Sequence, residues 1–291
     1  MPFRVGILST KMGRHIEALQ KALAKHGAAS DYLPITRLVA RVSGRPYASS
    51  AGHPLEAYDA IIVRIIPDGS LEQIIFRMDV LHRLEDLGIR IMNSPSTIER
   101  TVDKYYTSSI LEAHGLPTPR TIVAEGFDEA MEAFRELGDV VVKPLFGAGG
   151  RGMVRITDPD IAYRTFRALE LGRYIFYIQE YIPHQDHDIR AFVVGKRVIA
   201  SMIRRSKGWK HNIAVGAKPE AFRLDEEAEA LSIKACEVLK ADYAGVDLLR
   251  SAEGKYSIIE VNSIPGWSGL QRTTSVNIAE EIVKHLMALL T

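Results

Sequence analysis

Residues 258–266, with the sequence Ile-Ile-Glu-Val-Asn-Ser-Ile-Pro-Gly, constrain the fold of this 291-residue chain more than any other segment. An apolar strand carries Glu260 and Asn262 and then meets a Pro-Gly turn. Because side chains alternate between the two faces of a strand, these two oxygen-bearing side chains share one face. A second apolar strand at residues 245–249 carries another carboxylate, Asp247.

These three side chains are candidate metal ligands. Carboxylate and amide oxygens are hard donors that suit Mg²⁺, which usually takes few protein ligands and completes its octahedron with water and substrate phosphate. The alternative is two ordinary strand ends with solvated acids. Candidate nucleotide-binding residues elsewhere in the chain, described below, favour the metal over that alternative.

The composition is that of a soluble globular protein with more than one domain: 46% of residues are hydrophobic and 25% are charged. The net charge of +1 gives no reason to expect a nucleic-acid or membrane partner. No apolar run approaches the roughly 20 residues of a membrane span. The apolar segment at the N-terminus, residues 1–8, is too short and too soon interrupted for a secretory signal. We therefore expect a cytoplasmic protein. The single cysteine, Cys236, excludes an internal disulfide and is expected in a helical core.

The order of the expected elements is that of an α/β (α+β) protein in three parts: residues 1–95, 96–174 and 175–291. In the first part we expect strands at 3–9, 60–66 and 88–92, helices at 14–26 and 71–87, and a loop at 37–57. In the second we expect helices at 96–102, 104–114, 127–137 and 160–171 and strands at 120–124, 139–143 and 153–157. In the third we expect strands at 175–181, 188–194 and 197–204 and helices at 226–240 and 276–290.

A glycine-rich loop follows the strand that ends at Lys143. Residues 147–152 match the pattern G-x-G-x-x-G, but the dinucleotide fold needs a helix after the loop, and residues 153–157 are predicted as a strand. A Walker A loop is excluded because Met-Val follows the last glycine instead of Lys-Ser/Thr. A hairpin loop can still fold over phosphates, since glycine lets main-chain N–H groups approach closely. The alternative is a mobile hairpin tip.

Together these motifs resemble those of the ATP-grasp ligases, and most of all the RimK-type branch, which joins L-glutamate to a carboxylate. The resemblance covers nearly the whole chain and implies an ATP-grasp fold preceded by an N-terminal α/β pre-ATP-grasp domain. The motifs occur in the family's order: Asp103-Lys104, Val142-Lys143-Pro144, the glycine loop, residues 179–182, residues 188–195, Gly245-Val-Asp247 and Glu260-Val-Asn262.

The resemblance also implies roles for single residues. Arg190 and Arg205 look like the family's arginines near the transferred phosphoryl and acyl groups. Asp247, Glu260 and Asn262 are implied to bind two Mg²⁺ ions, which Mn²⁺ can replace, with Glu260 bridging them. The residues implied to bind ATP are Lys104 and Lys143 at the phosphates, Gly147, Gly149 and Gly150 in the loop, the main chain of Glu180 and Tyr181 at adenine, Asp188 at ribose, and Asn212 near the phosphates and metal.

The chain departs from the related ligases before this asparagine, where they have Arg-Ser-Asn and this chain has Lys210-His211-Asn212. A lysine keeps the charge of arginine but loses its bidentate fork. For His211, a position on a surface loop is favoured over a role as ligand or base.

Gly266, Trp267 and Ser268 follow the metal strand, where the family's loop meets the acyl acceptor. Trp267 is expected either to stack on a substrate ring or to anchor the last helix. The Pro-Gly-Trp form is similar to that of coenzyme-modifying members, which add glutamate to tetrahydromethanopterin or a deazaflavin coenzyme. It lacks the Glu-Val-Asn-His-Thr pattern of ligases acting on the amino-group carrier protein of lysine biosynthesis.

Arginines outside these motifs are candidates for holding a carboxylate of glutamate or of the acceptor. Arg64 is the first of them, and Arg77 and Arg272 are further ones. An interdomain or surface ion pair is the favoured alternative for each.

The expected activity is an ATP-dependent ligation of a carboxylate and an amine through an acyl phosphate, adding L-glutamate to a small coenzyme or metabolite. Such phosphoryl transfer needs positioning and charge neutralisation and no enzyme nucleophile. Three alternatives stay open: glutamylation of a protein C-terminus such as that of a ribosomal protein, phosphotransfer to a hydroxyl, and nucleotide binding without turnover. Because related ligases are often dimers or tetramers, we also expect a homo-oligomer.

Overall fold

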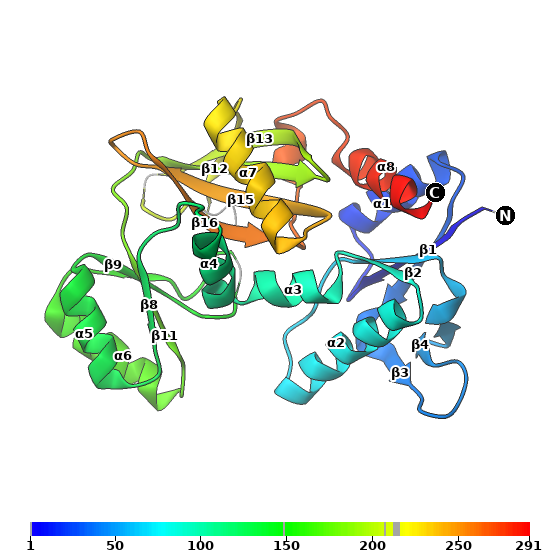
Figure 1. Ribbon diagram of the computed structural model, residues 1–291, viewed down its shortest axis with the longest axis horizontal. Helices are drawn as coiled ribbons and strands as arrows, with labels where there is room; N and C mark the ends of the chain where they lie inside the picture. Colours follow the sequence, from blue (N-terminus) through cyan, green and yellow to red (C-terminus); the bar gives the residue numbers. More distant parts are fainter. Residues whose placement is uncertain (1, 148, 207, 212–215) are drawn as a thin grey trace.

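The computed structural model describes residues 2–147, 149–206, 208–211 and 216–291, and it is built around three main sheets (Figure 1). The N-terminal sheet is parallel, with the order β2-β1-β6-β7. Its strands are β1 (Arg4–Ser9), β2 (Ala29–Pro34), β6 (Ala60–Val63) and β7 (Arg90–Met92). Helix α1 (Arg14–Lys25) packs on one face and α2 (Leu71–Asp86) on the other, which explains why β1 and β6 are almost continuously apolar.

The prediction of a loop at residues 37–57 is wrong. This segment contains a small antiparallel sheet of β3 (Leu38–Ala40), β4 (Ala48–Ser50) and β5 (His53–Pro54). The strands are only two or three residues long, so no period-two pattern can develop. The Glu56 carboxylate helps to hold the sheet by accepting from the N–H groups of Tyr47 at 2.6 Å and Ala48 at 3.3 Å.

The middle unit has an antiparallel sheet of order β10-β9-β11-β8. Its strands are β8 (Thr121–Ala124), β9 (Val140–Lys143), β10 (Val154–Ile156) and β11 (Phe176–Glu180), and α5 (Phe127–Leu137) and α6 (Pro159–Leu171) close a separate core. The glycine-rich loop joins antiparallel β9 and β10, so the exclusion of a dinucleotide fold is confirmed. Since β11 pairs with β8 and β9, we propose that this unit ends after Glu180 rather than at residue 174.

The C-terminal unit has an antiparallel sheet of order β14-β13-β12-β15-β16. Its strands are β12 (His187–Val194), β13 (Arg197–Arg205), β14 (Lys218–Ala221), β15 (Tyr243–Arg250) and β16 (Tyr256–Asn262). Helix α7 (Glu226–Leu239) covers one face, and α8 (Ile278–Leu290) packs with α1 on the other. Cys236 is a buried residue of α7, as predicted, and burial raises the pKa of its thiol to about 12.

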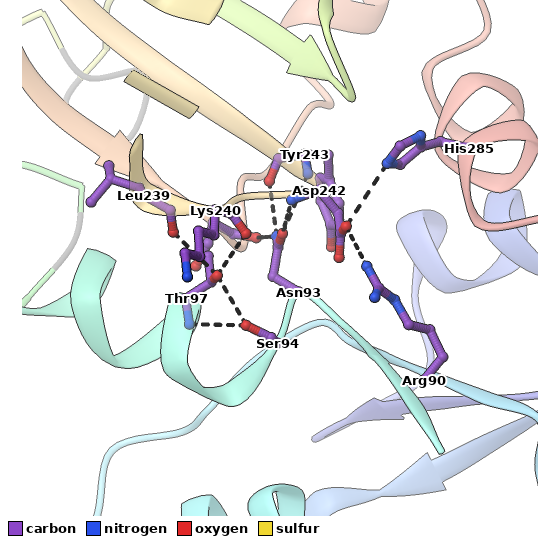
Figure 2. A network of polar contacts seen from close by, with 10 residues as sticks. Arg90, Asn93, Ser94, Thr97, Leu239, Lys240, Asp242, Tyr243 and His285 are labelled. Atoms are coloured by element: carbon purple, nitrogen blue, oxygen red, sulfur yellow. Dashed lines mark hydrogen bonds and ion pairs between the residues drawn. The ribbon is translucent and has the colours of Figure 1, made fainter. Parts of the chain in front are cut away.

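Asn93 connects the N-terminal unit to the two strands that carry the predicted metal ligands (Figure 2). Its side-chain nitrogen donates to the carbonyls of Tyr243 at 2.8 Å and Ser263 at 2.6 Å. Its side-chain oxygen accepts from the N–H groups of Asp242 at 2.6 Å and Tyr243 at 3.3 Å. Beside it, Arg90 pairs with Asp242 at 2.5 Å. This one amide therefore fixes the start of β15 and the segment after β16 against the end of β7. The helices α3 (Pro95–Val102) and α4 (Lys104–Ala113) then lead to the middle unit.

We predict that Asn93→Ala lowers the free energy of unfolding by about 3 kcal/mol, because it leaves several buried main-chain groups without partners. The matched control is Asn277→Ala, which removes the cap that accepts from Glu280 N–H at the start of α8 and should cost about 1 kcal/mol. Urea unfolding followed by circular dichroism measures both. Equal losses in the two variants would contradict the role given to Asn93.

Candidate active site

A cleft lies between the middle sheet and the C-terminal sheet, and most of the predicted nucleotide and metal residues line it. They come from α4, from β9 and the glycine loop, from the end of β11, and from β12, β15 and β16. The predicted residues found there are Lys104, Lys143, Gly147, Gly149, Gly150, Glu180, Tyr181, Asp188, Asp247 and Glu260. Segments more than 150 residues apart in sequence thus meet in one cleft.

The predicted metal carboxylates are direct neighbours. Asp247 and Glu260 are paired residues of antiparallel β15 and β16, and Asn262 pairs with Gly245 two residues along. Paired residues project to the same face, so all three candidate ligands share the face that the sequence predicted. The Asn262 side-chain oxygen also accepts from the N–H of Ile264 at 3.0 Å.

Asp247 is almost fully buried and is held by two arginines. Arg190 donates through Nε and Nη2 to its two oxygens, the Nη2–Oδ2 distance being 2.7 Å, and Nη2 of Arg204 lies 2.9 Å from Oδ2. Burial acts to raise the pKa of Asp247, but the two guanidinium groups outweigh it and hold the pKa below its usual range. These contacts use three of about four lone-pair positions of the carboxylate. Asp247 is therefore an ionised, oriented oxygen donor with room for one more partner.

This donor set fits Mg²⁺. Within the described ranges, no group of three His, Cys, Asp or Glu side chains forms a complete metal cage. Two neighbouring carboxylates and one amide instead provide the partial shell that Mg²⁺ takes when substrate phosphate and water supply the remaining ligands.

Arg204 also lines the cleft, and the sequence analysis did not select it. It donates through Nε and Nη2 to Asp188 at 2.7 and 2.5 Å, and it is 4% exposed. The prediction for Arg205 is corrected: its side chain projects from the other face of β13 and pairs with Asp186 and Glu220. A bulge after Phe192 shifts the register of β12 and β13 by one residue. That shift pairs Asp188 with Arg204 and turns Arg205 away from the cleft.

Asp188, the predicted ribose acceptor, lies in the cleft wall but already accepts from Arg204 through both oxygens. Burial raises its pKa to about 6, and the charge of Arg204 opposes that rise. A ribose hydroxyl would have to share these oxygens with the guanidinium group.

The two predicted phosphate lysines face Glu260 across the cleft. Lys143 donates to the side-chain oxygen of Gln179 at 2.5 Å, and Lys104 donates to the carbonyls of Leu145 at 3.2 Å and Gly147 at 3.0 Å. Burial lowers the pKa of both amines, that of Lys143 to about 8, where the charge of Lys104 adds to the effect. These hydrogen bonds thus hold both lysine side chains in the part of the cleft where the phosphates are expected.

The backbone of the glycine loop has a conformation that favours glycine. Gly149 and Gly150 both have φ of +73°, a left-handed conformation that residues with a Cβ rarely adopt. Glycine at these positions also leaves the main chain open to close approach by a ligand.

At the predicted adenine position, the N–H groups of Glu180 and Tyr181 are already used by the fold. They donate to the carbonyls of Arg120 at 2.9 Å and Asp139 at 2.8 Å. Of the main-chain polar groups of these two residues, only the carbonyl oxygens therefore remain to bind a base. Apolar side chains complete this part of the cleft: Val141, Ile182, Leu249 and Ile259.

The residues that depart from the family pattern also line the cleft. Lys210 donates to the Met153 carbonyl at 2.5 Å and so links the C-terminal unit to the end of the glycine loop. His211 is 4% exposed, which corrects the expectation of a surface position, and its Nε2 lies 2.9 Å from Nε2 of His184. Burial lowers the pKa of His211 to about 4, so it is neutral at pH 7. Asn212 lies outside the described residues.

Two of the predicted substrate residues are structural anchors. Arg64 is 8% exposed and donates to the Tyr243 hydroxyl at 2.8 Å and the Pro265 carbonyl at 2.7 Å, and its guanidinium lies 4.5 Å from the Trp267 ring centre. Trp267 is buried between Arg64 and His15, whose ring centre is 4.3 Å away. The prediction that Arg64 binds a substrate carboxylate is therefore corrected. Of the two roles expected for Trp267, its burial favours the anchor over stacking on a substrate ring. Both side chains fix the loop after β16 to the N-terminal unit.

The other two predicted substrate residues, Gly266 and Ser268, are exposed. The Ser268 hydroxyl lies 2.9 Å from Nε2 of His15, a residue of α1 that no sequence motif marked. The main-chain N–H of Trp267, which can only donate, also donates to this nitrogen at 3.3 Å. Burial and the charge of Arg64 lower the pKa of His15 to about 4. His15 is therefore neutral at pH 7 and accepts through Nε2.

With this geometry established, comparison with known proteins identifies the class. Residues 101–286 match the RimK-like ATP-grasp domain. The chain is 38% identical to the tetrahydromethanopterin:alpha-L-glutamate ligase of Methanocaldococcus jannaschii over 73% of this chain and 75% of that protein. It is 32% identical to the ligase of the same name from Methanococcus maripaludis over 98% of each. It is 34% identical to the alpha-aminoadipate–LysW ligase LysX of Sulfurisphaera tokodaii over 69% and 73%.

The chain belongs to the RimK-like ATP-grasp family, whose named members among these relatives are ligases. Solved structures share its fold. The ATP-grasp ligase PsnB superposes with a TM-score of 0.75 at 19% identity, covering 98% of each chain. A RimK domain ATP-grasp protein from Sphaerobacter thermophilus superposes with a TM-score of 0.75 at 22% identity, covering 98% and 99%. In the described parts of the chain, no helix has the length and apolar character of a membrane span.

Lys143 should make ATP binding depend on pH. Because burial lowers its pKa to about 8, a fraction of the free protein has lost this charge at pH 8, and the bound triphosphate should restore it. We therefore expect ATP binding to take up protons at pH 8 and to weaken as the pH rises above 8. Calorimetric titration in buffers of different ionisation enthalpy measures the uptake. Lys143→Arg keeps the charge and should abolish it; equal uptake in that variant would exclude Lys143 as the source.

Arg204 and Arg205 are adjacent in sequence, so substituting each in turn tests whether Arg204 rather than Arg205 belongs to the site. Arg204→Lys loses the bidentate contact with Asp188 and should lower kcat/KM at least about tenfold. Arg205→Lys alters only exposed ion pairs and should stay within about twofold. Steady-state ADP release gives both values. A larger loss in the Arg205 variant would restore the original prediction.

Proposed function

We propose that this protein uses ATP to activate a carboxylate as an acyl phosphate and joins it to the amino group of L-glutamate. The observation that carries the proposal is the placement of Asp247 and Glu260 opposite Lys104 and Lys143 in one cleft. The first reaction transfers the γ-phosphoryl group of ATP to a carboxylate oxygen and leaves ADP. In the second, the amine attacks the acyl carbon, phosphate leaves, and the amine loses a proton.

Each charged residue has a part in the first reaction. Lys104 and Lys143 would bind the phosphates from the side of the glycine loop, where Lys104 now holds loop carbonyls. Arg190 and Arg204 would keep Asp247 ionised and fixed, so that no reorganisation is needed when charge moves. Positioning and neutralisation of this kind is the main contribution an enzyme makes to phosphoryl transfer.

We further propose that Asp247, Glu260 and Asn262 hold two Mg²⁺ ions, for which Mn²⁺ can substitute. When bound, the ions would neutralise the phosphate oxygens. The structure of PsnB with Mg and ADP supports this choice of metal and nucleotide.

For the acceptor we propose a small coenzyme carboxylate of the tetrahydromethanopterin kind. Three relatives at 31–38% identity are named tetrahydromethanopterin:alpha-L-glutamate ligases. Since Arg64 and Trp267 are buried, Ser268 is the member of the predicted set Arg64, Gly266, Trp267 and Ser268 whose polar side chain is exposed, and its hydroxyl lies 2.9 Å from Nε2 of His15. We assign this pair to substrate contact. A mass gain of one glutamyl residue on a coenzyme incubated with the protein, ATP, Mg²⁺ and L-glutamate tests the assignment.

The variant Glu260→Gln tests the activity itself. It keeps the size of the side chain but removes one charge from the metal pair, so ADP release that requires both carboxylate and amine should fall to background. Glu253→Gln, an exposed change in the turn between β15 and β16, is the control and should retain full activity. ADP release that needs no amine in the unaltered protein would instead indicate phosphotransfer. Full ligation by Glu260→Gln would refute the metal assignment.

A further inference from the structure

The segment between β11 and β12 links the middle unit to the C-terminal unit, and the change from one unit to the other falls at Ile182. Before it, the N–H groups of Glu180 and Tyr181 donate to carbonyls of the middle unit. After it, His184 forms a bridge with Ser251, which directly follows β15 of the C-terminal unit. The main chain of Ile182 therefore lies where the two walls of the nucleotide cleft meet.

A chain of side-chain hydrogen bonds holds the carbonyl of Ile182. Nδ1 of His184 lies 2.6 Å from this oxygen, and Nε2 of the same ring lies 2.9 Å from Nε2 of His211. Nδ1 of His211 in turn lies 3.0 Å from the hydroxyl of Ser206, the residue after β13. Ile182, His184 and His211 all line the cleft, so this chain borders the nucleotide site.

Only one placement of hydrogens satisfies the chain when both imidazoles are neutral. The Ile182 carbonyl can only accept, so His184 donates from Nδ1 and accepts at Nε2. His211 must then donate from Nε2 and accept the Ser206 hydrogen at Nδ1. Burial is the main cause that lowers the pKa of both histidines, that of His211 to about 4, and both are therefore neutral at pH 7.

The segment that carries His211 also holds the glycine loop. Lys210 donates to the carbonyl of Met153, at the end of that loop, at 2.5 Å. Two adjacent residues thus contact the link between the units on one side and the glycine loop on the other. The position of the link therefore depends on a segment that also fixes the phosphate side of the cleft.

We propose that His184 and His211 are positioning residues that align the link with the adenine base and so select ATP over GTP. This inference rests on the proposed use of ATP and not on the identity of the acyl acceptor. The carbonyls of Glu180 and Tyr181 can accept from the adenine amino group, where guanine carries an accepting oxygen. A site built to bond one polar group rejects an analogue that lacks it, provided that the site is held in place. A loosened link loses both affinity for ATP and discrimination against guanine.

Two substitutions of His211, each matching one ring nitrogen, test the proposal. A glutamine amide reaches the position of Nε2 and can still donate to His184, whereas an asparagine amide reaches only the position of Nδ1. His211→Gln should therefore bind ATP within about twofold of the unaltered protein, and His211→Asn at least about fivefold more weakly, because a buried acceptor is left unpaired. The preference for ATP over GTP should fall in His211→Asn and be kept in His211→Gln.

Calorimetric titration with ATP or GTP and Mg²⁺, without acyl acceptor, measures these affinities. His53→Asn, at an exposed position in β5, is the control and should change neither of them. If the unaltered protein binds no ATP, the proposed function fails together with this inference. If it binds ATP and His211→Asn binds ATP and GTP equally well as the unaltered protein does, only this inference is refuted.

Kinetics separate positioning of the base from a part in the chemistry. In His211→Asn the KM for ATP should rise while kcat at saturating ATP stays within about twofold, because a loosely held base weakens ground state and transition state alike. A fall in kcat with an unchanged KM would contradict the assignment.

Nitrogen-15 NMR of the histidine rings gives a readout that a merely structural role would not require. At pH 7, His184 should carry its proton on Nδ1 and His211 on Nε2, with a scalar coupling between the two Nε2 atoms across their hydrogen bond. The coupling should be absent in His211→Asn. A His184 ring protonated on Nε2 in the unaltered protein would overturn the proposed chain.

Discussion

The site depends on a buried carboxylate held by two arginines. Asp247 sits between Arg190 and Arg204, and Arg204 is in turn held by Asp188. Removing one partner of such a group is expected to cost about 3–5 kcal/mol, because an unpaired charge would remain in the interior. Buried ion pairs add little net stability compared with apolar packing, so stability alone does not explain this network. Its effect on the charge and orientation of Asp247 explains it better. It keeps Asp247, the proposed metal ligand, ionised and oriented before substrate arrives.

The rest of the fold keeps this network in place. Asn93 fixes the start of β15 and the segment after β16, and Arg64 and Trp267 fix the following loop to the same N-terminal unit. The middle unit has its own core and meets the metal strands across the cleft through polar contacts such as that of Lys210. The cleft thus has one wall that is strongly tied to the N-terminal unit and one wall that is packed separately. Such a division suits a site that must admit a nucleotide and then enclose it.

Sequence periodicity was sufficient from Glu260 to Asn262, because the irregularity in the β15–β16 pairing lies on the other side of Asp247, before Leu248. Alternation placed Glu260 and Asn262 on one face, and pairing with β15 brought Asp247 beside Glu260. It failed where the register is irregular. A regular hairpin from the turn at Gly195 would pair Asp188 with Ile203 and put Arg205 on the site face, but the bulge after Phe192 selects Arg204. A bulge depends on the packing of both strands, which no local pattern reveals.

The burial of certain charged and aromatic side chains could not be predicted from the sequence either. Arg64 and Trp267 have the residue types of a substrate site, and only their packing against Tyr243, Pro265 and His15 shows that they are anchors. His15 carried no motif because its role arises from contact with a loop more than 250 residues away. The short strands β3 to β5 were missed because their length allows no pattern.

The most direct test of the central claim is a crystal structure of the protein with a nonhydrolysable ATP analogue and Mn²⁺, in which anomalous scattering locates the metal. The account predicts a metal peak bonded to oxygens of Asp247 and Glu260, with Arg190 and Arg204 still on Asp247 and the phosphates beside Lys104 and Lys143. A metal bound elsewhere, or an analogue that leaves these two carboxylates without a metal between them, would contradict it.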